Sequence, residues 1–251
     1  MATSNCKLIS YNCKSIKRSI EGVRDLCKIG DVIALQETWL MPYDLSILGT
    51  IDGNFGSTGT SAVDTSAGLL TGRPYGGVAL LWRKSAFDSV SVIKCNNVRV
   101  TAIKITVSSR CMVVFSVYMP TNSVENIPLF TECLGTVRSI IEYEENLGVE
   151  TFYILGDFNA HPDEIFYNEL LNFCNDYSWC CADVTMLGFQ SDTFTYRSDS
   201  HRDCVKWLDH ALVTQSALTT VNKVWVKYDV FWSDHFPLIV ECNWRKVNKR
   251  M

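Results

Sequence analysis

Several short polar segments of this chain contain side chains that can hold a metal ion or move a proton. In chain order, these side chains are Asn12, Glu37, Tyr118, Asp157, Asn159, Thr195, Asp209, Asp234 and His235. Carboxylates and amides supply the hard oxygen ligands that Mg²⁺ prefers, and histidine and tyrosine can donate hydrogen bonds to anionic oxygens. Such a combination suits hydrolysis of a phosphate ester, which needs an activated water and neutralised phosphoryl oxygens.

The residue types suggest a division of roles for the metal ion and the water. Mg²⁺ keeps several of its own waters, so one or two carboxylates suffice to hold it. Glu37 fits that role, with Asn12 beside it. Asp157 can orient or deprotonate water, and Asn159 can donate an amide hydrogen bond to a phosphate. The sequence alone leaves open which carboxylate is the general base and whether one or two metal ions take part.

The histidine of the last polar segment is expected to stabilise the anionic phosphate. Asp209 can hold the His235 imidazole in one orientation and favour its charged form. Tyr118 and Thr195 offer hydroxyl groups to phosphate oxygens, and Asp234 is expected to lie at the metal ion. Each of these residues taken singly is more simply a turn, cap or core residue. The combination in one chain favours the chemical interpretation.

These side chains lie where expected strands end, which is where catalytic groups converge in α/β sheets. Apolar residues at helical spacing predict helices from Ser15 to Gly30, over about residues 126–147 and over residues 163–174. The expected strands cover residues 7–12, 31–37, 77–82, 90–94, 98–107, 111–118, 151–155, 193–196, 207–213, 221–228 and 237–242.

The order of these elements predicts an α/β fold with two mixed β-sheets. Strict alternation of strand and helix, which would indicate one doubly wound sheet, is absent. The region 49–76 has seven glycines among Ser and Thr and is expected to be a long functional loop. No linker or repeat divides the chain, so we expect a single domain over residues 1–251.

The composition narrows the class of protein. The eleven cysteines are scattered, several of them within apolar runs, and no Cys-x-x-Cys spacing occurs, which favours reduced thiols over disulfides or a structural zinc site. No secretory signal or membrane-length apolar run is present. The net charge of −4 gives no bulk basic character for nucleic acid binding, although basic residues cluster locally.

The order of motifs resembles the endonuclease/exonuclease/phosphatase superfamily. These motifs are Asn12, Gln36-Glu37, Tyr118-x-Pro120, Gly156-Asp157-Phe158-Asn159, Asp209-His210 and Ser233-Asp234-His235. The resemblance implies a four-layered α/β sandwich and hydrolysis of phosphodiesters or phosphomonoesters with Mg²⁺ or Mn²⁺. It also implies the roles given above, and since Asp209 is the matched acid, we expect the neighbouring His210 to be structural.

Within this superfamily the chain resembles most the nuclease domain of LINE-type (non-LTR) retrotransposons. Lys14 stands where cellular apurinic repair enzymes commonly carry an acid, and Tyr75–Trp82 and Val117–Pro120 resemble the LINE-type domains. The resemblance implies a domain excised from a longer polyprotein that nicks target DNA to leave a 3′-hydroxyl for reverse transcription. Its partners would be double-stranded DNA and the reverse transcriptase region, with no membrane.

The segment from Arg197 to Lys206 is expected to be a hairpin that contacts DNA. Arg197, Arg202 and Lys206 place positive charge beside the expected phosphate site. The resemblance implies action in the nucleus after synthesis in the cytoplasm, without secretion. Two alternatives stay open: a cellular apurinic/apyrimidinic repair endonuclease, and a catalytically inactive DNA-binding module.

Overall fold

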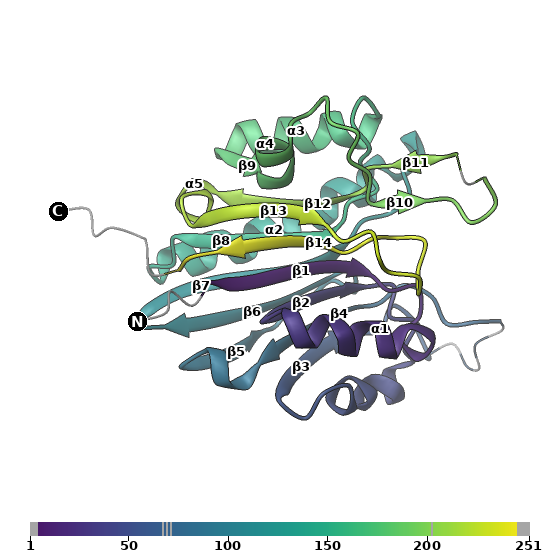
Figure 1. Cartoon of the computed structure of the whole chain (residues 1–251), viewed down its shortest axis with the longest axis horizontal. Coiled ribbons are helices and arrows are strands. Elements are labelled where there is room, and N and C mark those ends of the chain that lie inside the picture. Colours follow the sequence, from purple (N-terminus) through teal and green to yellow (C-terminus); the bar gives the residue numbers. More distant parts are fainter. Residues whose placement is uncertain (1–4, 67, 69, 71, 202, 245–251) are drawn as a thin grey trace.

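Two six-stranded β-sheets pack face to face and carry helices on their outer faces (Figure 1). The structure is a computed structural model and describes residues 5–244 except residues 67, 69, 71 and 202. Among these described residues, no helix combines the length and apolar character that crossing a membrane requires.

The first sheet has the order β13-β14-β1-β2-β4-β3, in which only β1 and β2 run parallel. Its strands are β1 (Cys6–Asn12), β2 (Val32–Gln36), β3 (Phe55–Thr60), β4 (Val78–Arg83), β13 (Val221–Val226) and β14 (Leu238–Cys242). Residues of β1 alternate between the two faces: Leu8 faces the opposite sheet, and Ile9 faces the helix outside. Because both faces are covered, both side chains are fully buried.

The second sheet has the order β5-β6-β7-β8-β12-β9, in which β7 and β8 are the parallel pair. Its strands are β5 (Ser89–Ile93), β6 (Val100–Val107), β7 (Arg110–Tyr118), β8 (Thr151–Asp157), β9 (Trp179–Cys181) and β12 (Asp209–Thr214). The connection between the parallel strands β7 and β8 contains a long helix, as a crossover between parallel strands requires.

The helices form the two outer layers. They are α1 (Ile16–Ile29), α2 (Ile127–Asn146), α3 (Ile165–Tyr177), α4 (Ala182–Leu187) and α5 (Gln215–Leu218), with 3-10 turns η1 (Pro42–Thr50), η2 (Lys84–Ala86) and η3 (Val124–Asn126). One apolar cluster joins α1 and η1 to the first sheet, a second fills the space between the sheets, and a third joins α2 and α3 to the second sheet. The four-layered sandwich of two mixed sheets is therefore confirmed.

The glycine-rich region is more ordered than its composition suggests. The expectation of an unbroken loop over residues 49–76 is wrong, because β3 (Phe55–Thr60) lies within it and pairs with β4. A side chain at Gly56 would collide with the indole of Trp82, and one at Gly59 would meet Leu48 and the carbonyl of Val78. These glycines allow other groups to pack closely against the strand. In the sequence they cannot be told apart from the glycines of a loop.

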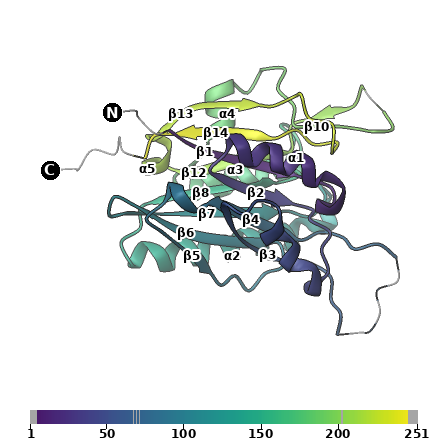
Figure 2. The ribbon, with the colours of Figure 1, turned by 60° about the horizontal axis from the view of Figure 1, so that its bottom comes forward.

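Two shorter segments also differ from expectation. β9 and α4 occupy the region from Trp179 to Leu187, for which the sequence predicts no element. Ser15 precedes α1, but its hydroxyl makes no capping hydrogen bond. The hairpin of β10 (Tyr196–Arg197) and β11 (Val205–Lys206) is confirmed, and it projects from the edge of the molecule at which β1 ends (Figures 1 and 2).

Candidate active site

Asn12 joins the two sheets at the edge where their parallel strands end. Its Nδ2 donates to Glu37 Oε1 and to Asp157 Oδ2, at 2.9 Å in each case. Glu37 follows β2 of the first sheet, and Asp157 is the last residue of β8 in the second sheet. Residues distant in sequence thus meet at one amide, as the expected strand ends predict.

Strand register brings further polar residues to the same edge. Tyr118 pairs with Asp157 across the parallel strands β7 and β8, and Asp209 pairs with Asp157 across β8 and β12. Glu37 and Asn159 have φ of 51° and 49°, a backbone region that non-glycine residues seldom adopt. Such residues cluster at functional sites, where the surrounding structure holds them in place.

The donor atoms around Asn12 fit a hard divalent cation. Glu37 Oε2 accepts a hydrogen bond from Trp39 Nε1 at 2.9 Å, so both carboxylate oxygens are held in fixed directions while keeping lone pairs. Among the described residues, the Asn12 Oδ1 accepts only the backbone N–H of Lys14, at 3.2 Å. Glu37 and Asn12 are therefore the oxygen ligands that this chain would offer to Mg²⁺.

Asp234 is placed differently from Glu37. Its Oδ2 lies 2.6 Å from the Lys14 ammonium, and its Oδ1 accepts a hydrogen bond from the Ser233 hydroxyl at 3.3 Å. The Ser233 hydroxyl also donates to the carbonyl of Asn12 at 2.8 Å, which ties this segment to the end of β1. The carboxylate predicted as a third metal ligand is thus neutralised by a lysine in this arrangement.

His235 lies between two buried carboxylates. Its Nδ1 is 2.8 Å from Asp209 Oδ2, and its Nε2 is 3.8 Å from Asp157 Oδ2, which is too far for a direct hydrogen bond. Burial on its own would lower the pKa of His235, but the Asp209 and Asp157 carboxylates outweigh it and raise the pKa to about 10. Burial raises the pKa of Asp157 while His235 acts in the opposite direction.

Tyr118 and Asn159, the other predicted side chains of the site, also have defined contacts. The Arg99 guanidinium lies 5.4 Å from the centroid of the Tyr118 ring, and burial, followed by Glu37 and Asp157, raises the pKa of the Tyr118 phenol. The Tyr118 hydroxyl therefore stays protonated and able to donate. Asn159 Nδ2 donates to the carbonyl of Met119 at 3.0 Å, which fixes the Asn159 side chain beside the site.

Thr195 does not reach the surface at which DNA is expected. Its side chain is fully buried, and its Oγ1 accepts the backbone N–H groups of Leu208 and Asp209 at 3.0 Å and 2.9 Å. The structure therefore gives Thr195 the task of holding the backbone of Asp209, in place of the phosphate contact predicted from the sequence. Thr195 lies just before β10 and outside any strand, although the sequence predicts a strand over residues 193–196.

The three basic residues of the hairpin have different surroundings. The Arg197 guanidinium stacks 4.9 Å from the Phe194 ring and 5.8 Å from the Phe236 ring. Lys206 pairs with Glu164 at 2.5 Å. Arg202 lies outside the described residues. Arg197 is thus the exposed described cation of the hairpin next to the site, and the charge of Lys206 is offset by its partner.

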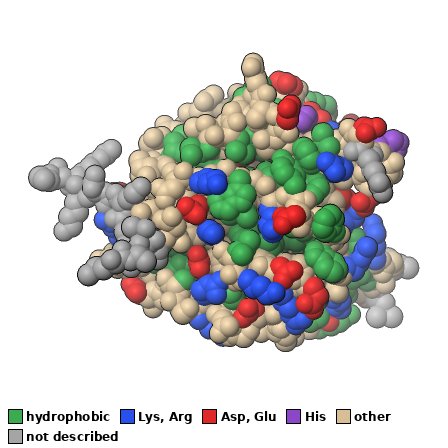
Figure 3. All heavy atoms as spheres, in the orientation of Figure 1, with side chains coloured by type: hydrophobic (Ala, Val, Ile, Leu, Met, Phe, Trp, Pro, Cys, Tyr) green, Lys and Arg blue, Asp and Glu red, His purple; other side chains and the backbone are tan. Residues whose placement is uncertain are grey.

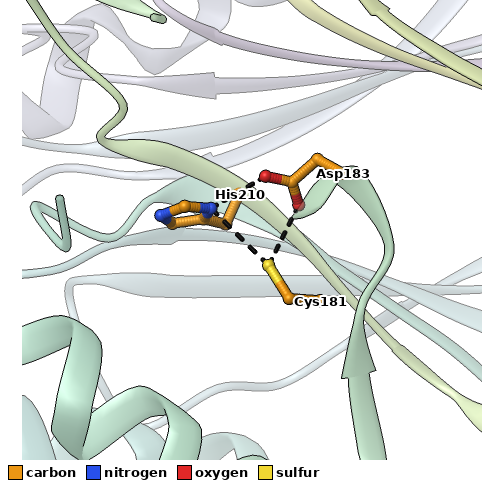
Figure 4. A group of neighbouring side chains, drawn as sticks. All are labelled: Cys181, Asp183 and His210. Carbon is orange, nitrogen blue, oxygen red and sulfur yellow. Dashed lines mark hydrogen bonds and ion pairs between the residues drawn. The ribbon is translucent and has the colours of Figure 1, made fainter. Parts of the chain in front are cut away.

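His210 is confirmed as a structural residue. It follows Asp209 on β12, so its ring points to the opposite face of the sheet, where its Nδ1 lies 2.8 Å from Asp183 Oδ2 and its Nε2 lies 2.8 Å from the carbonyl of Ala160. The Cys181 thiol completes this fully enclosed group at 3.2 Å from Asp183 Oδ1 (Figure 4). Although burial opposes it, Asp183 raises the pKa of His210.

Sequence reasoning missed several residues that support the site. Trp39 orients Glu37, Ser233 joins Asp234 to Asn12, and Arg99 covers Tyr118. Trp39 lies two residues after Glu37, and Ser233 directly precedes Asp234, so proximity to the motifs was their available signal. Arg99 carried none, because only the pairing of β6 with β7 brings it to the ring.

Comparison with known proteins agrees with this geometry. The model of the Endonuclease/Exonuclease/phosphatase family matches residues 9–235. No curated protein matches the sequence. The fold is similar to the endonuclease domain of TRAS1, a telomere-specific non-LTR retrotransposon, with a TM-score of 0.72 and 13% identity over 96% of this chain and 100% of that one.

Repair-type nucleases have the same fold. The AP endonuclease LMAP from Leishmania major has a TM-score of 0.74 and 14% identity, covering 95% of this chain and 88% of that one. The 3′-5′ exonuclease NExo from Neisseria meningitidis has a TM-score of 0.68 and 18% identity, covering 95% of this chain and 100% of that one. At these identities the likeness establishes the shared fold.

Proposed function

Because the chain belongs to the endonuclease/exonuclease/phosphatase family, we propose that it is a Mg²⁺-dependent DNA endonuclease that leaves a 3′-hydroxyl at each nick. The observation that carries this proposal is the buried His235, whose Nε2 makes no hydrogen bond with any described residue. A cationic imidazole with one free N–H can stabilise the negative charge that develops on a phosphodiester during hydrolysis. A carboxylate and the oxygen atoms that could bind a metal ion lie beside it.

The residues divide the work of hydrolysis between them. Asp209 holds the imidazole through Nδ1, so that the Nε2–H of His235 can donate to a phosphoryl oxygen. Asp157 faces the same space, and its raised pKa suits a group that takes a proton from the attacking water near neutral pH. Tyr118 donates its phenolic hydrogen to a second phosphoryl oxygen.

Glu37 and Asn12 would hold the metal ion. When bound, Mg²⁺ supplies Lewis-acid polarisation of the phosphoryl group and neutralises charge at the leaving oxygen. Asn12 also donates to Glu37 and Asp157 at once, so it keeps the expected metal ligand and the expected base at a constant separation.

The proposed substrate is intact double-stranded DNA, nicked to prime reverse transcription. The fold similarity to a retrotransposon endonuclease domain supports this choice, as do the Tyr75–Trp82 and Val117–Pro120 segments. We further propose that the chain is a single domain of a retrotransposon polyprotein, which acts in the nucleus with a reverse transcriptase region of the same polyprotein. Basic and acidic side chains intermingle on the face shown in Figure 3, which fits contact with DNA through a local site and a protruding hairpin.

A cellular apurinic/apyrimidinic endonuclease is the second candidate, supported by the shared fold of the Leishmania enzyme. Lys14 argues against it, because it stands two residues after Asn12, where repair enzymes of the family commonly carry an acid, and its ammonium pairs with Asp234. A catalytically inactive binding module is disfavoured, because His235, Asp209 and Asp157 are assembled in one site.

A plasmid assay tests the proposal. The chain should convert supercoiled plasmid to open circle with Mg²⁺ or Mn²⁺ and should stop with chelator. Glu37→Gln should lose the activity, whereas Glu132→Gln, which removes the same charge from the exposed face of α2, should retain it. Undiminished nicking in chelator would refute the metal-dependent mechanism, and binding without nicking would favour the inactive module.

A further inference from the structure

The ammonium group of Lys14 lies between two carboxylates from different parts of the chain. Its Nζ is 2.6 Å from Asp234 Oδ2 and 2.8 Å from Asp199 Oδ2. Asp234 belongs to the catalytic edge and is largely buried, whereas Asp199 belongs to the turn of the β10–β11 hairpin and its side chain is 75% exposed. One lysine therefore connects the floor of the site to the element expected to contact DNA.

Hydrogen bonds to two site residues fix the backbone around Lys14. Lys14 has a φ of 43°, and its N–H donates to the Asn12 side chain at 3.2 Å. The next residue, Ser15, has a φ of 88° and donates its N–H to the carbonyl of Glu37 at 2.8 Å. A backbone held in this uncommon conformation by bonds to two site residues fixes the point from which the lysine side chain extends, and the two carboxylates hold its ammonium.

The turn of the hairpin is otherwise bonded mainly to itself. Ser198 N–H donates to the carbonyl of Cys204, Cys204 N–H donates to the carbonyl of His201, and the Ser198 and Ser200 hydroxyls lie 3.2 Å apart. Within the part of the chain that the structure describes, Lys14–Asp199 is the one ion pair that joins residues 198–201 and 203 to the body of the protein. The base of the hairpin is anchored separately, by Arg197 N–H donating to the carbonyl of Asp234 at 2.8 Å.

We propose that Lys14 is a positioning residue that tethers the hairpin turn to the catalytic edge through Asp199, and that this tether influences where DNA is nicked. The inference rests on the proposed nicking function. A hairpin lying against DNA selects sites through the shape and deformability of the groove, so its angle to the catalytic edge decides which steps come into register. With the tether broken, the turn samples more orientations and the choice of site broadens.

The expected effect is modest, because Asp199 is well exposed. Ion pairs with an exposed partner shift an equilibrium by about two- to fivefold. The untethered fraction of hairpins, and the share of nicks at sites that the unaltered protein rarely uses, should therefore rise by about that factor. The metal requirement and the total nicking rate should stay close to those of the unaltered chain, because Asp199 touches no proposed ligand or catalytic group.

Asp199→Asn tests the tether with two measurements on the whole chain. Hydrogen exchange without DNA should show the amides of Ser198 and Cys204 exchanging about two to five times faster. Nick positions mapped on one supercoiled plasmid in Mg²⁺ should redistribute. Asp203→Asn removes the same charge from the same turn at a residue that pairs with no described cation, and it should leave the exchange of these amides unchanged. Asp199→Glu, which keeps the charge, should restore both.

Repeating the test in a protein that lacks Lys14 separates loss of the tether from a general effect of charge. In Lys14→Met, the further change Asp199→Asn should have no additional effect on exchange or on nick positions, because the tether is already gone. Unchanged exchange in Asp199→Asn, or altered exchange with an identical nick map, would overturn the inference, as would an equal effect of Asp203→Asn on exchange. Absence of nicks by the unaltered chain in Mg²⁺ would refute the proposed function instead, and the exchange comparison would still decide on the tether.

Discussion

Replacing Asp209 by Asn removes one charge from the histidine site with almost no change in volume. Asp209 Oδ2 lies 2.8 Å from His235 Nδ1, and Asp209 is, after burial, the strongest influence on a His235 pKa of about 10. Without that carboxylate, burial opposes the charged imidazole with less to offset it, so the pKa of His235 should fall, and each pKa unit lost corresponds to ~1.4 kcal/mol. At pH 7.5 a larger fraction of the protein would then lack the imidazolium than in the unaltered chain.

The nicking rate should report this loss directly. Removing a positioned proton donor or its orienting carboxylate costs on the order of 10²- to 10⁴-fold. We expect Asp209→Asn to lose at least about 10²-fold at pH 7.5 and to regain part of that loss as the pH is lowered through the new pKa of His235. Single-turnover nicking of supercoiled plasmid between pH 6 and 9 gives the rates, and ¹⁵N NMR of the histidines gives the pKa.

Asp183→Asn is the matched control. Asp183 makes the same carboxylate–histidine contact at 2.8 Å with His210, but on the opposite face of β12 and away from the site. This variant should lose stability while the folded fraction keeps a rate within severalfold of the unaltered chain. The assigned role of Asp209 would be refuted if Asp209→Asn nicked within about threefold of the unaltered rate at pH 7.5, since the expected loss is at least about 10²-fold. Equal losses of rate in the two variants would also refute it.

Two further predictions concern pH and substrate. Because the folded-state pKa of His235 is raised, the charged imidazole contributes its full stability below about pH 6.5, and this contribution is lost as the pH rises toward 10. The free energy of unfolding of the unaltered chain, measured with urea in chelator, should therefore fall between pH 7 and 8.5 by up to ~1.4 kcal/mol per pH unit more steeply than that of His235→Gln. Equal slopes in the two proteins would contradict the raised pKa. Because Lys14 pairs with Asp234, intact duplex should be nicked at least as readily as an abasic duplex of matched sequence, and an abasic preference of several hundredfold would place the chain with the repair enzymes.

Local patterns carried enough information to predict the layers of the fold. Leu8 and Ile9 alternate between two buried faces, and the apolar stripe of α1 packs against one of them. The prediction of a loop over residues 49–76 was wrong because glycine occurs both in loops and in closely packed strands. Gly56 and Gly59 resemble loop residues in the sequence, yet they lie in β3 because Trp82 and Leu48 need the space that a side chain would fill.

The candidate site was predictable where chemistry constrains the pairing. A carboxylate beside a phosphate-binding histidine is a recurrent arrangement, so Asp209 and His235 could be paired from their residue types. The surroundings of Lys14 could not, because Asp199 and Asp234 are 185 and 220 residues away along the chain and meet it only in the folded protein. The burial of Thr195 was not predictable for a related reason, since its hydroxyl accepts from the backbone of Leu208 and Asp209, which are 13 and 14 residues away along the chain.

The chemistry of the nick tests the central claim most directly. Intact supercoiled plasmid is incubated with the chain in Mg²⁺, the reaction is stopped with chelator, and a DNA polymerase is then given labelled nucleotides without any phosphatase treatment. Open-circle product that the polymerase extends from each nick is the predicted result, with none formed when chelator is present from the start. Nicks that cannot be extended until a 3′-phosphate is removed, or nicks formed equally well in chelator, would contradict it.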